Sequence, residues 1–251
     1  MLIMVELELR RLTHDRTEMY YRAVQPVLWI LVFGPVMQSL RGNVLYEGKP
    51  YTSFITPGII MQSAIFVAIF YGLTLVWERD SGILKKLLVT PISRYGTVIG
   101  RSMASGVRGI VQGLIVIPFA LIIGVQFVPN VGYFVLAYVI IFFSSGGFAA
   151  ISIIMASFMK TRERFMGLGQ AITMPIFFLS NALYPLNGLT GWLSALQYIA
   201  ACNPMSYIID AVRDLMITGN MSTLPTDLIV ILVFVVAMYI LAAVSFKRII
   251  E

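Results

Sequence analysis

The sequence predicts an all-α integral membrane protein with six transmembrane helices. Of its 251 residues, 59% are hydrophobic and 12% are charged, and the mean hydropathy is +0.87. A soluble domain carries about 25% charged residues. A helix needs roughly 20 apolar residues to cross the hydrocarbon core of a bilayer, and six runs of about that length follow one another. We therefore assign residues 1–251 to a single transmembrane domain.

Charges and helix-breaking residues set the limits of the six spans. No charged residue occurs from 109 to 159, a stretch of 51 residues that is too long for one span. Pro129, Asn130 and Gly132 supply turn residues that divide this stretch into a hairpin of two spans. The predicted spans are 23–40, 54–77, 96–125, 133–159, 165–184 and 228–246.

The distribution of Lys and Arg predicts the orientation. Cytoplasmic loops retain positive residues, and the loops on the opposite side hold only Arg41, Lys49 and Arg213. We expect a multi-pass protein of the cell (plasma) membrane, surrounded by lipid, with both termini in the cytoplasm. The net charge of +6 lies in short clusters and makes no continuous basic face, so no nucleic-acid partner is predicted. The clusters are Arg10, Arg11, Arg16 and Arg22; Arg79, Lys85, Lys86, Arg94 and Arg101; Lys160, Arg162 and Arg164; and Lys247 and Arg248.

The segment 1–22 precedes the first span and has an amphipathic pattern. Its apolar residues recur close to a helical period, and its charged residues occupy the other faces. This pattern predicts an interfacial helix on the inner membrane surface. The alternative is a solvated cytoplasmic segment. The apolar positions are Leu2, Val5, Leu9, Leu12 and Met19.

A charged island lies between the second and third spans, and its segment 79–91 predicts a short amphipathic helix. Ile83, Leu84, Leu87 and Leu88 share one face, and Pro91 ends the helix because proline disfavours helical geometry in the residue before it. A helix this short is not stable alone in water, so its Leu face must be buried. The residues themselves leave two interpretations open, a helix that docks on a partner and a loop that rests on lipid head groups.

Arg101 and Arg108 lie seven residues apart, hence on one face of the third span near its cytoplasmic boundary. Two interpretations stay open. Long arginine side chains at a boundary can extend to the head groups, or they can pair with Glu78 or Asp80. In either case they lie near the charged island.

In the outer segment 187–218, apolar sequence continues after the fifth span from Gly188 to Ile199, a run that is too short to cross the membrane again. It predicts outer re-entrant or interfacial helices. Asn203 can cap a helix that has Pro204 at its first position, and Asp210 can pair with Arg213 at a spacing of three. The segment can be an outer gate, a packed cap, or both.

Three stretches carry a family resemblance. They are Glu78-Arg79 with Gly82 and 87–94 (LLVTPISR), then 178–186 (FLSNALYPL), and then 203–213 (NPMSYIIDAVR). In order and spacing they resemble the ABC-2 type permeases, which are the membrane subunits of ABC exporters such as the daunorubicin-resistance and nodulation-factor export permeases. One departure is that Lys85 stands where family members often carry an acidic residue.

The resemblance implies a half-transporter in which two membrane subunits, either two copies of this chain or this chain with a similar one, associate with two ATPase subunits. The segment 79–91 is then a coupling helix between spans two and three, and 1–22 rests on the same ATPase. The resemblance implies ATPase coupling by Glu78, Arg79, Gly82, Ile83, Leu84, Leu87, Leu88, Thr90 and Pro91, and an outer gate of Tyr184, Pro185, Asn203, Pro204, Asp210 and Arg213. By their position near the cytoplasmic boundary, Arg101 and Arg108 are then candidates for transmission.

The sequence contains no G-x-x-x-x-G-K-[ST] stretch to hold nucleotide phosphates. We expect ATP and Mg²⁺ on the separate ATPase subunit, no cofactor and no metal on this chain, no enzyme activity of its own, and outward movement of a hydrophobic or amphiphilic cargo such as a drug, a lipid or a lipid-linked glycan. The alternative is an ATP-independent small-molecule carrier or channel. It is disfavoured because the predicted spans contain no acidic residue or histidine for a proton relay. A membrane enzyme is disfavoured because no catalytic constellation is apparent.

Overall fold

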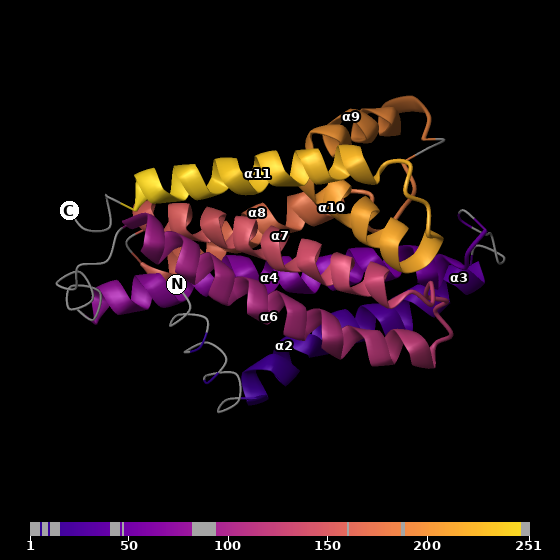
Figure 1. Cartoon of the computed structure of the whole chain (residues 1–251), viewed down its shortest axis with the longest axis horizontal. Coiled ribbons are helices and arrows are strands. Elements are labelled where there is room, and N and C mark those ends of the chain that lie inside the picture. Colours follow the sequence, from indigo (N-terminus) through magenta and orange to yellow (C-terminus); the bar gives the residue numbers. More distant parts are fainter. Residues whose placement is uncertain are drawn as a thin grey trace.

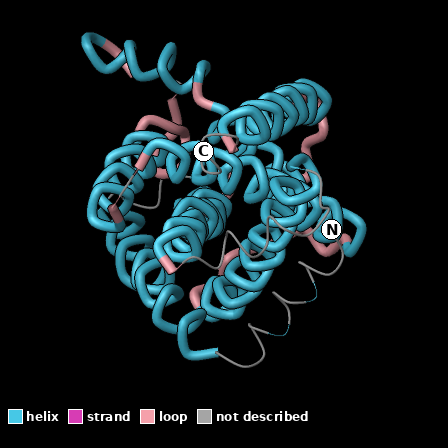
Figure 2. Tube along the Cα trace, turned by 90° about the vertical axis from the view of Figure 1, so that its left-hand side faces the viewer, coloured by secondary structure: helices cyan, strands magenta, loops and turns pink. Residues whose placement is uncertain are grey.

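The computed structural model describes residues 6, 10, 16–40, 46, 48–81, 94–159, 161–186 and 189–246. In this part of the chain the regular structure is helical, apart from one isolated β-bridge between Tyr46 and Lys49. The helices pack side by side in an elongated bundle (Figures 1 and 2). The all-helical prediction is confirmed.

The first membrane helix runs without a break through three segments: α2 (Arg16–Leu28), the π-helix η1 (Trp29–Phe33) and α3 (Gly34–Leu40). The Gly34 N–H donates to the carbonyl of Trp29, five residues earlier. This wider turn directly precedes Pro35, whose ring clashes with the carbonyl four residues before it in a regular α-helix. The helix crosses the predicted boundary between 1–22 and 23–40 with no interruption.

The helix α4 (Tyr51–Asp80) is the centre of the bundle. It packs against α2, α3, α6, α7, α8 and α10, and most of its residues are buried. Its 30 residues reach about 45 Å at 1.5 Å per residue, so it is longer than the roughly 30 Å hydrocarbon core. The predicted span 54–77 lies within α4, which continues for a further turn to Asp80.

The helices α6 (Arg94–Ile122) and α7 (Val131–Phe158) form the predicted hairpin. Asn130 caps α7, because its side-chain oxygen accepts hydrogen bonds from the N–H groups of Gly132 and Tyr133. Small residues bring α6 and α7 together: a Cβ atom placed on Gly109 would lie 2.3 Å from the Ser145 hydroxyl oxygen. The two helices therefore approach each other closely at this part of α6.

The helix α8 (Arg162–Phe178) begins at the cap residue Thr161 and is shorter than the predicted span 165–184. It ends early because the residues that follow it leave the helix and pack closely against α4. The contact is so close that a Cβ atom on Gly58 of α4 would lie 2.7 Å from the carbonyl oxygen of Ala182. With 17 residues, α8 is at the lower limit of about 17–25 for a membrane helix. Five helices of the described residues are long and apolar enough to cross a membrane: Met19–Leu40, Tyr51–Asp80, Tyr95–Ile122, Val131–Phe158 and Leu224–Ser245.

The chain after α8 folds over one end of the bundle before the last helix. It forms a 3₁₀ turn η2 (Gly191–Ser194), α9 (Ala195–Cys202), α10 (Pro204–Arg213) and a π-helix η3 (Asp214–Thr218). The helix α10 is buried against α4, α7 and α11 (Leu224–Ser245), whereas α9 lies outside the bundle (Figure 1). Residues 189–218 are thus helical for most of their length, and none of these helices is long enough to span a membrane.

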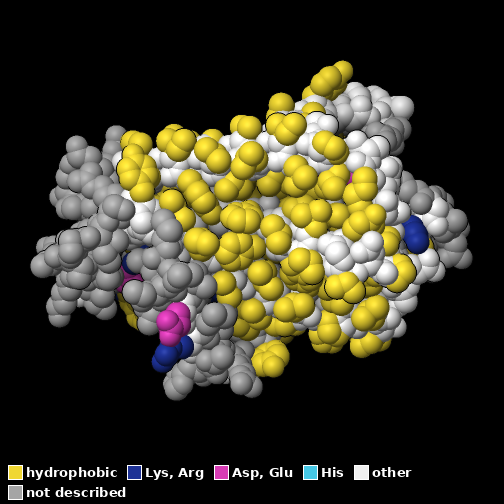
Figure 3. Space-filling view, viewed as in Figure 1, with side chains coloured by type: hydrophobic (Ala, Val, Ile, Leu, Met, Phe, Trp, Pro, Cys, Tyr) yellow, Lys and Arg dark blue, Asp and Glu magenta, His cyan; other side chains and the backbone are white. Residues whose placement is uncertain are grey.

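Apolar side chains cover the face made by α6, α7 and α11 (Figure 3). Exposed apolar residues of these three helices include Leu114, Val135, Phe143, Ile229, Leu232 and Val236. A soluble monomer rarely exposes so large an apolar surface, and the acyl chains of a bilayer match it. We name the two ends of the bundle after arginines: the Arg101 end, where α4 and α7 end and α6 and α8 begin, and the opposite Arg213 end.

Candidate functional site

At the Arg101 end, an ion pair joins α4 to α6. Arg101 donates from Nη2 to the carboxylate of Glu78, and both side chains are largely buried, at 8% and 16% exposed. A lone charge would be costly to bury at this place, and here each of the two charges is paired with the other. The sequence left two interpretations of Arg101, extension to the lipid head groups and pairing with an acidic residue. The structure shows the pairing, with Glu78 as the partner. The carboxylate of Glu78 is directed into the bundle.

Arg79 joins the last turn of α4 to the end of α7. Its guanidinium donates to the backbone carbonyls of Met159, at 2.8 Å, and Ala156, at 3.4 Å. Carbonyls in the last turn of a helix and at its C-cap have no intrahelical partner, and the Arg79 side chain satisfies one of each. The end of α4 is thus bound on one side to α6 and on the other to α7.

Arg108 occupies a different place from Arg101. It lies two turns further along α6, is 9% exposed, and places its guanidinium 5.3 Å from the centre of the Tyr71 ring. The carboxylate of Asp80 instead lies 3.9 Å from Arg79 and 3.7 Å from Arg162. The two arginines that the sequence placed on one face therefore meet different partners on α4.

The coupling residues that follow α4 lie outside the described residues. They are Gly82, Ile83, Leu84, Leu87, Leu88, Thr90 and Pro91. Most of the segment 1–22 lies outside them as well, although residues 16–22 form the start of the first helix. Ser81, immediately before this stretch, ends α4, and its hydroxyl donates to the carbonyls of Trp77 and Glu78.

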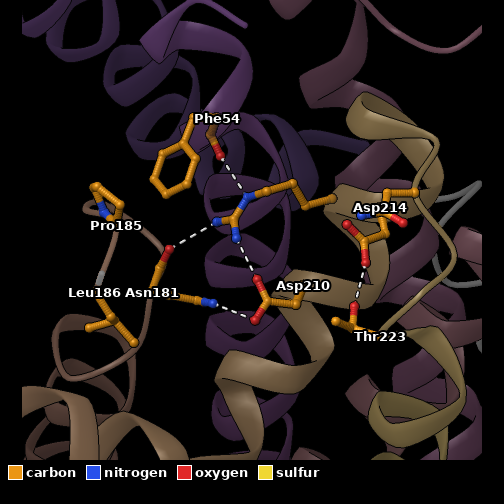
Figure 4. Close-up of a pocket in the computed structure, with 9 residues that line it drawn as sticks. Phe54, Asn181, Pro185, Leu186, Asp210, Asp214 and Thr223 are labelled. Atoms are coloured by element: carbon orange, nitrogen blue, oxygen red, sulfur yellow. Dashed lines mark hydrogen bonds and ion pairs between the residues drawn. The ribbon is translucent and has the colours of Figure 1, made fainter. Parts of the chain in front are cut away.

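At the Arg213 end, one buried guanidinium connects three parts of the chain (Figure 4). Arg213 on α10 is 4% exposed, and its Nε donates to the carbonyl of Phe54 on α4, at 3.2 Å. Its Nη2 donates to the carbonyl of Asn181, at 2.9 Å, and its Nη1 donates to Asp210 at 2.5 Å. We call Arg213, Asp210, Asn181 and Phe54 the Arg213 lock.

The lock has two further supports. The amide of Asn181 donates to the second carboxylate oxygen of Asp210, at 2.6 Å, so both oxygens of Asp210 are bound. The Arg213 guanidinium also lies 4.1 Å from the centre of the Phe54 ring. The predicted pairing of Asp210 with Arg213 is confirmed, and it is one part of a larger network.

The start of α10 is built as the sequence predicts. The side chain of Asn203 accepts from the N–H of Met205, and Pro204 occupies the first turn. The Asn203 amide also donates to the carbonyl of Ile176, at 2.7 Å, and so fixes α10 to α8. The hydroxyl of Tyr184 donates to the carbonyl of Phe178 and closes the turn after α8.

A cavity of about 290 Å³ adjoins the lock (Figure 4). Polar and charged groups make up most of its lining, and Asp214 is held there by hydrogen bonds from Thr223, at 2.7 Å, and Thr218, at 3.0 Å. The lining residues are Phe54, Asn181, Pro185, Leu186, Asp210, Arg213, Asp214, Asn220 and Thr223. Predicted gate residues Pro185, Asp210 and Arg213 thus meet around one cavity, whereas Tyr184, Asn203 and Pro204 support the elements around it.

One buried carboxylate was missed in the sequence. Asp227 was placed outside the sixth span, but α11 begins at Leu224, with Pro225 in its first turn, and Asp227 is 4% exposed. The predicted spans contain no acidic residue, but the helices extend beyond them: α11 includes Asp227, and α4 includes Glu78 and Asp80. Among the described residues, no group of three His, Cys, Asp or Glu side chains is arranged to hold a metal ion.

The long apolar helices and the two charged ends define a multi-pass membrane protein. A family model of ABC-2 type transporters matches residues 1–217. The chain belongs to this ABC-2 type transporter family of membrane permeases, and the resemblance carried by the three sequence stretches is confirmed.

Named relatives agree with this assignment. A protein of Cyanophora paradoxa, named as transport permease ycf38, is 27% identical over 76% of this chain, and the match covers 64% of that relative, less than two thirds of its length. A Mycobacterium tuberculosis protein named as doxorubicin resistance ABC transporter permease DrrC is 26% identical over 84% of this chain and 74% of its own length. Nodulation protein J of Rhizobium leguminosarum is 22% identical over 89% of this chain and 84% of its own length.

Proposed function

We propose that the chain is the membrane-spanning subunit of an ATP-driven ABC exporter. A separate ATPase subunit, which carries ATP and Mg²⁺, drives the segment 79–91 at the Arg101 end, and the cargo leaves at the Arg213 end. The cargo is hydrophobic or amphiphilic: a drug, a lipid or a lipid-linked glycan. A second copy of the chain, or a similar one, completes the transporter. The Arg101 end then faces the cytoplasm, with both termini. Family membership and the names of DrrC and nodulation protein J support this proposal.

One observation carries the proposal beyond the family assignment. The last turn of α4, immediately before the segment 82–91, is bound to α6 through Glu78 and Arg101 and to α7 through Arg79. A partner that displaces this segment also displaces the end of α4, and the two contacts pass that movement to the neighbouring helices. Glu78 and Arg79 therefore act inside the permease as transmission residues, and the Leu face of 83–88 is the part that contacts the ATPase.

The Arg213 lock suits a closed outer gate. It joins α4, α10 and the turn after α8 through buried hydrogen bonds. Opening a path beside α10 requires at least one of these partners to separate. The lock holds the end of the bundle closed until the movement of α4 withdraws the Phe54 carbonyl from Arg213.

We expect an open reading frame adjacent to that of the chain to encode an ABC ATPase, and the test expresses the two proteins together. We expect the two proteins to copurify, and Leu87→Asp with Leu88→Asp to abolish copurification because the Leu face no longer fits its partner. Leu87→Ile with Leu88→Ile is the matched control and should retain binding. Assembly of the double Asp variant with unchanged cargo-stimulated ATP hydrolysis would rule out this face as the contact.

The same complex tests transmission. In inverted vesicles, Glu78→Arg alone and Arg101→Glu alone should each reduce ATP-dependent transport at least about tenfold, because two like charges then face each other in a buried site. Both changes together should restore part of the rate. Transport that continues at the full rate without ATP would favour the ATP-independent carrier instead.

A further inference from the structure

Buried polar side chains meet inside the bundle, between α4, α6 and α7. Ser105 and Gln112 lie seven residues apart on one face of α6, and Tyr138 and Ser145 lie seven residues apart on one face of α7. Ser105, Gln112 and Ser145 are 0% exposed, and the hydroxyl of Tyr138 is buried. We call these four residues the polar seam.

The glycine at position 109 places the seam where three helices meet. A Cβ atom on Gly109 would lie 2.3 Å from the Ser145 hydroxyl oxygen and 3.6 Å from the Cβ atom of Ala64 on α4. Gly109 follows Ser105 by four residues and precedes Gln112 by three, so the three residues share one face of α6. That face is directed at the junction with α4 and α7.

Tyr138 reaches the same junction further along α6. A Cβ atom on Gly113 would lie 3.6 Å from the Tyr138 hydroxyl oxygen and 3.3 Å from the side chain of Ile60 on α4. Because each helical residue rises about 1.5 Å, the seam extends for about 10 Å along the bundle. It lies between the two charged ends, where the surrounding membrane is hydrocarbon.

The polar atoms of the seam are buried without hydrogen bonds. Within the part of the chain that the structure describes, the hydroxyl oxygens of Ser105, Tyr138 and Ser145 and both amide atoms of Gln112 have no hydrogen-bond partner. Serines suit the close packing of membrane helices because they are small, but this does not explain a glutamine and a tyrosine. Each unpaired group costs free energy that an apolar side chain would not. The seam therefore gains hydrogen bonds when the three helices separate.

We propose that α4 separates from α6 and α7 along the polar seam when the transporter opens, and that the seam then binds the polar part of the cargo. The inference rests on the proposed exporter function and adds to it the route of the cargo. The amide of Gln112 and the three hydroxyls can each donate and accept hydrogen bonds. They match hydroxyl or amide groups of an amphiphile, which find no such partners in the hydrocarbon core.

Thiol labelling in the assembled transporter tests whether the seam opens. Gln112→Cys is made in a Cys202→Ser background, which removes the single cysteine of the chain. A membrane-impermeant methanethiosulfonate reacts with the thiolate, which forms where water reaches the side chain and is suppressed in apolar surroundings. Addition of ATP and cargo should speed up the labelling of Gln112→Cys severalfold.

Two positions on α6 provide matched controls. Ala104 is 0% exposed and, as the neighbour of Ser105, lies on a different face of the helix. Leu114 is 52% exposed on the apolar surface of the bundle. Neither Ala104→Cys nor Leu114→Cys should gain labelling with ATP, because the first is packed away from the seam and the second is surrounded by hydrocarbon.

Unfolding of the full chain in detergent tests the unpaired amide and needs neither ATP nor cargo. Gln112→Leu should raise the denaturant midpoint, because leucine leaves no polar atom unpaired. The same change at Gln38 is the control: its amide oxygen accepts from the Thr52 hydroxyl, at 3.0 Å, so Gln38→Leu should lower the midpoint. In the assembled transporter, Gln112→Leu should slow transport by about fivefold, the loss expected for one hydrogen bond.

The outcomes separate this inference from the exporter function. If ATP drives transport but Gln112→Cys is labelled no faster than Ala104→Cys, the seam does not open and the exporter function stands. A lower midpoint for Gln112→Leu, or transport at the parent rate, would also overturn the inference. If transport needs no ATP, the exporter function fails instead, and the inference then holds only if cargo alone speeds up the labelling of Gln112→Cys.

Discussion

Arg213 connects three parts of the chain at its end of the bundle. A single side chain provides hydrogen bonds to α4, to the turn after α8 and to its own helix. Its charge is buried, and Asp210 supplies the opposite charge. Because removal of one partner leaves the other buried without compensation, the cost of a substitution here exceeds the value of any one bond.

Arg213→Gln should lower the free energy of unfolding by about 2–3 kcal/mol. A fully buried pair loses about 3–5 kcal/mol when one partner is removed, and the loss here is smaller because the Asp210 side chain is 38% exposed. Denaturant unfolding of the purified chain in detergent measures the change. Arg164→Gln, an exposed arginine on α8, is the control and should stay within about 0.5 kcal/mol of the parent protein. Equal stability of the two variants would mean that the lock contributes nothing.

The sequence predicted side-chain partners better than it predicted backbone partners. Asp210 and Arg213 at a spacing of three, and Asn203 before Pro204, are local patterns, and both were predicted. The carbonyls of Phe54 and Asn181 carry no sequence signal, because every residue has one and only the fold brings them to Arg213. Asn181 itself lies in the stretch 178–186 that carried the family resemblance. Its polar amide in this stretch was the one feature of the sequence that could have indicated a role in the lock.

At the scale of elements, the bounds of the helices were harder to predict than their order. Charge marked the end of the second span at Trp77, but α4 continues to Asp80 because Glu78 and Arg79 find partners on α6 and α7. The fifth span was expected to reach Tyr184, but α8 ends at Phe178 because the next residues pack beneath α4. Both differences arise from tertiary contacts, which apolar runs do not reveal. The segment 82–91 lies outside the described residues, so its helix stays a prediction.

Gly72→Ala should test the contact between α4 and α7. A Cβ atom there would lie 2.7 Å from the backbone carbonyl of Ser152, which cannot move without shifting the helix. We expect a loss of about 1–3 kcal/mol in the free energy of unfolding, measured by denaturant titration. Gly109→Ala should cost less, because much of its clash is with the Ser145 hydroxyl, which can rotate.

The matched control for this change is Gly167→Ala on α8. A Cβ atom there meets nothing within 4 Å, so the substitution should be neutral or should stabilise the helix by up to about 1 kcal/mol. A loss at Gly167 equal to that at Gly72 would mean that the close contact between α4 and α7 is not what limits stability.

At the scale of the whole molecule, the apolar face and the charged ends fix how the bundle lies in a membrane, whereas the choice of which end faces the cytoplasm rests on the positive residues. The single cysteine of the sequence, Cys202, is exposed on α9 near the Arg213 end. It therefore provides a natural label for the end that we assign to the outside.

A membrane-impermeant maleimide should label Cys202 in intact cells. In a Cys202→Ser background, Ser81→Cys at the opposite end should react only after the cells are made permeable. The thiol thus lies at the Arg213 end in the parent protein and at the Arg101 end in the variant. Labelling is measured by a shift in gel mobility or by fluorescence. If Ser81→Cys reacted in intact cells and Cys202 did not, the Arg101 end would face the outside, opposite to the orientation that we assign.

The length of α4 has a thermodynamic consequence. The Phe54 carbonyl and the Glu78 carboxylate belong to one helix and lie about 36 Å apart along it, at 24 intervening steps of about 1.5 Å. When this helix moves as a rigid body, the two sites share one equilibrium, and the free energy that couples them is reciprocal. A substitution that weakens the Arg213 lock then also changes the affinity for the ATPase at the other end, by at most the factor with which ATPase binding favours the opening of the lock.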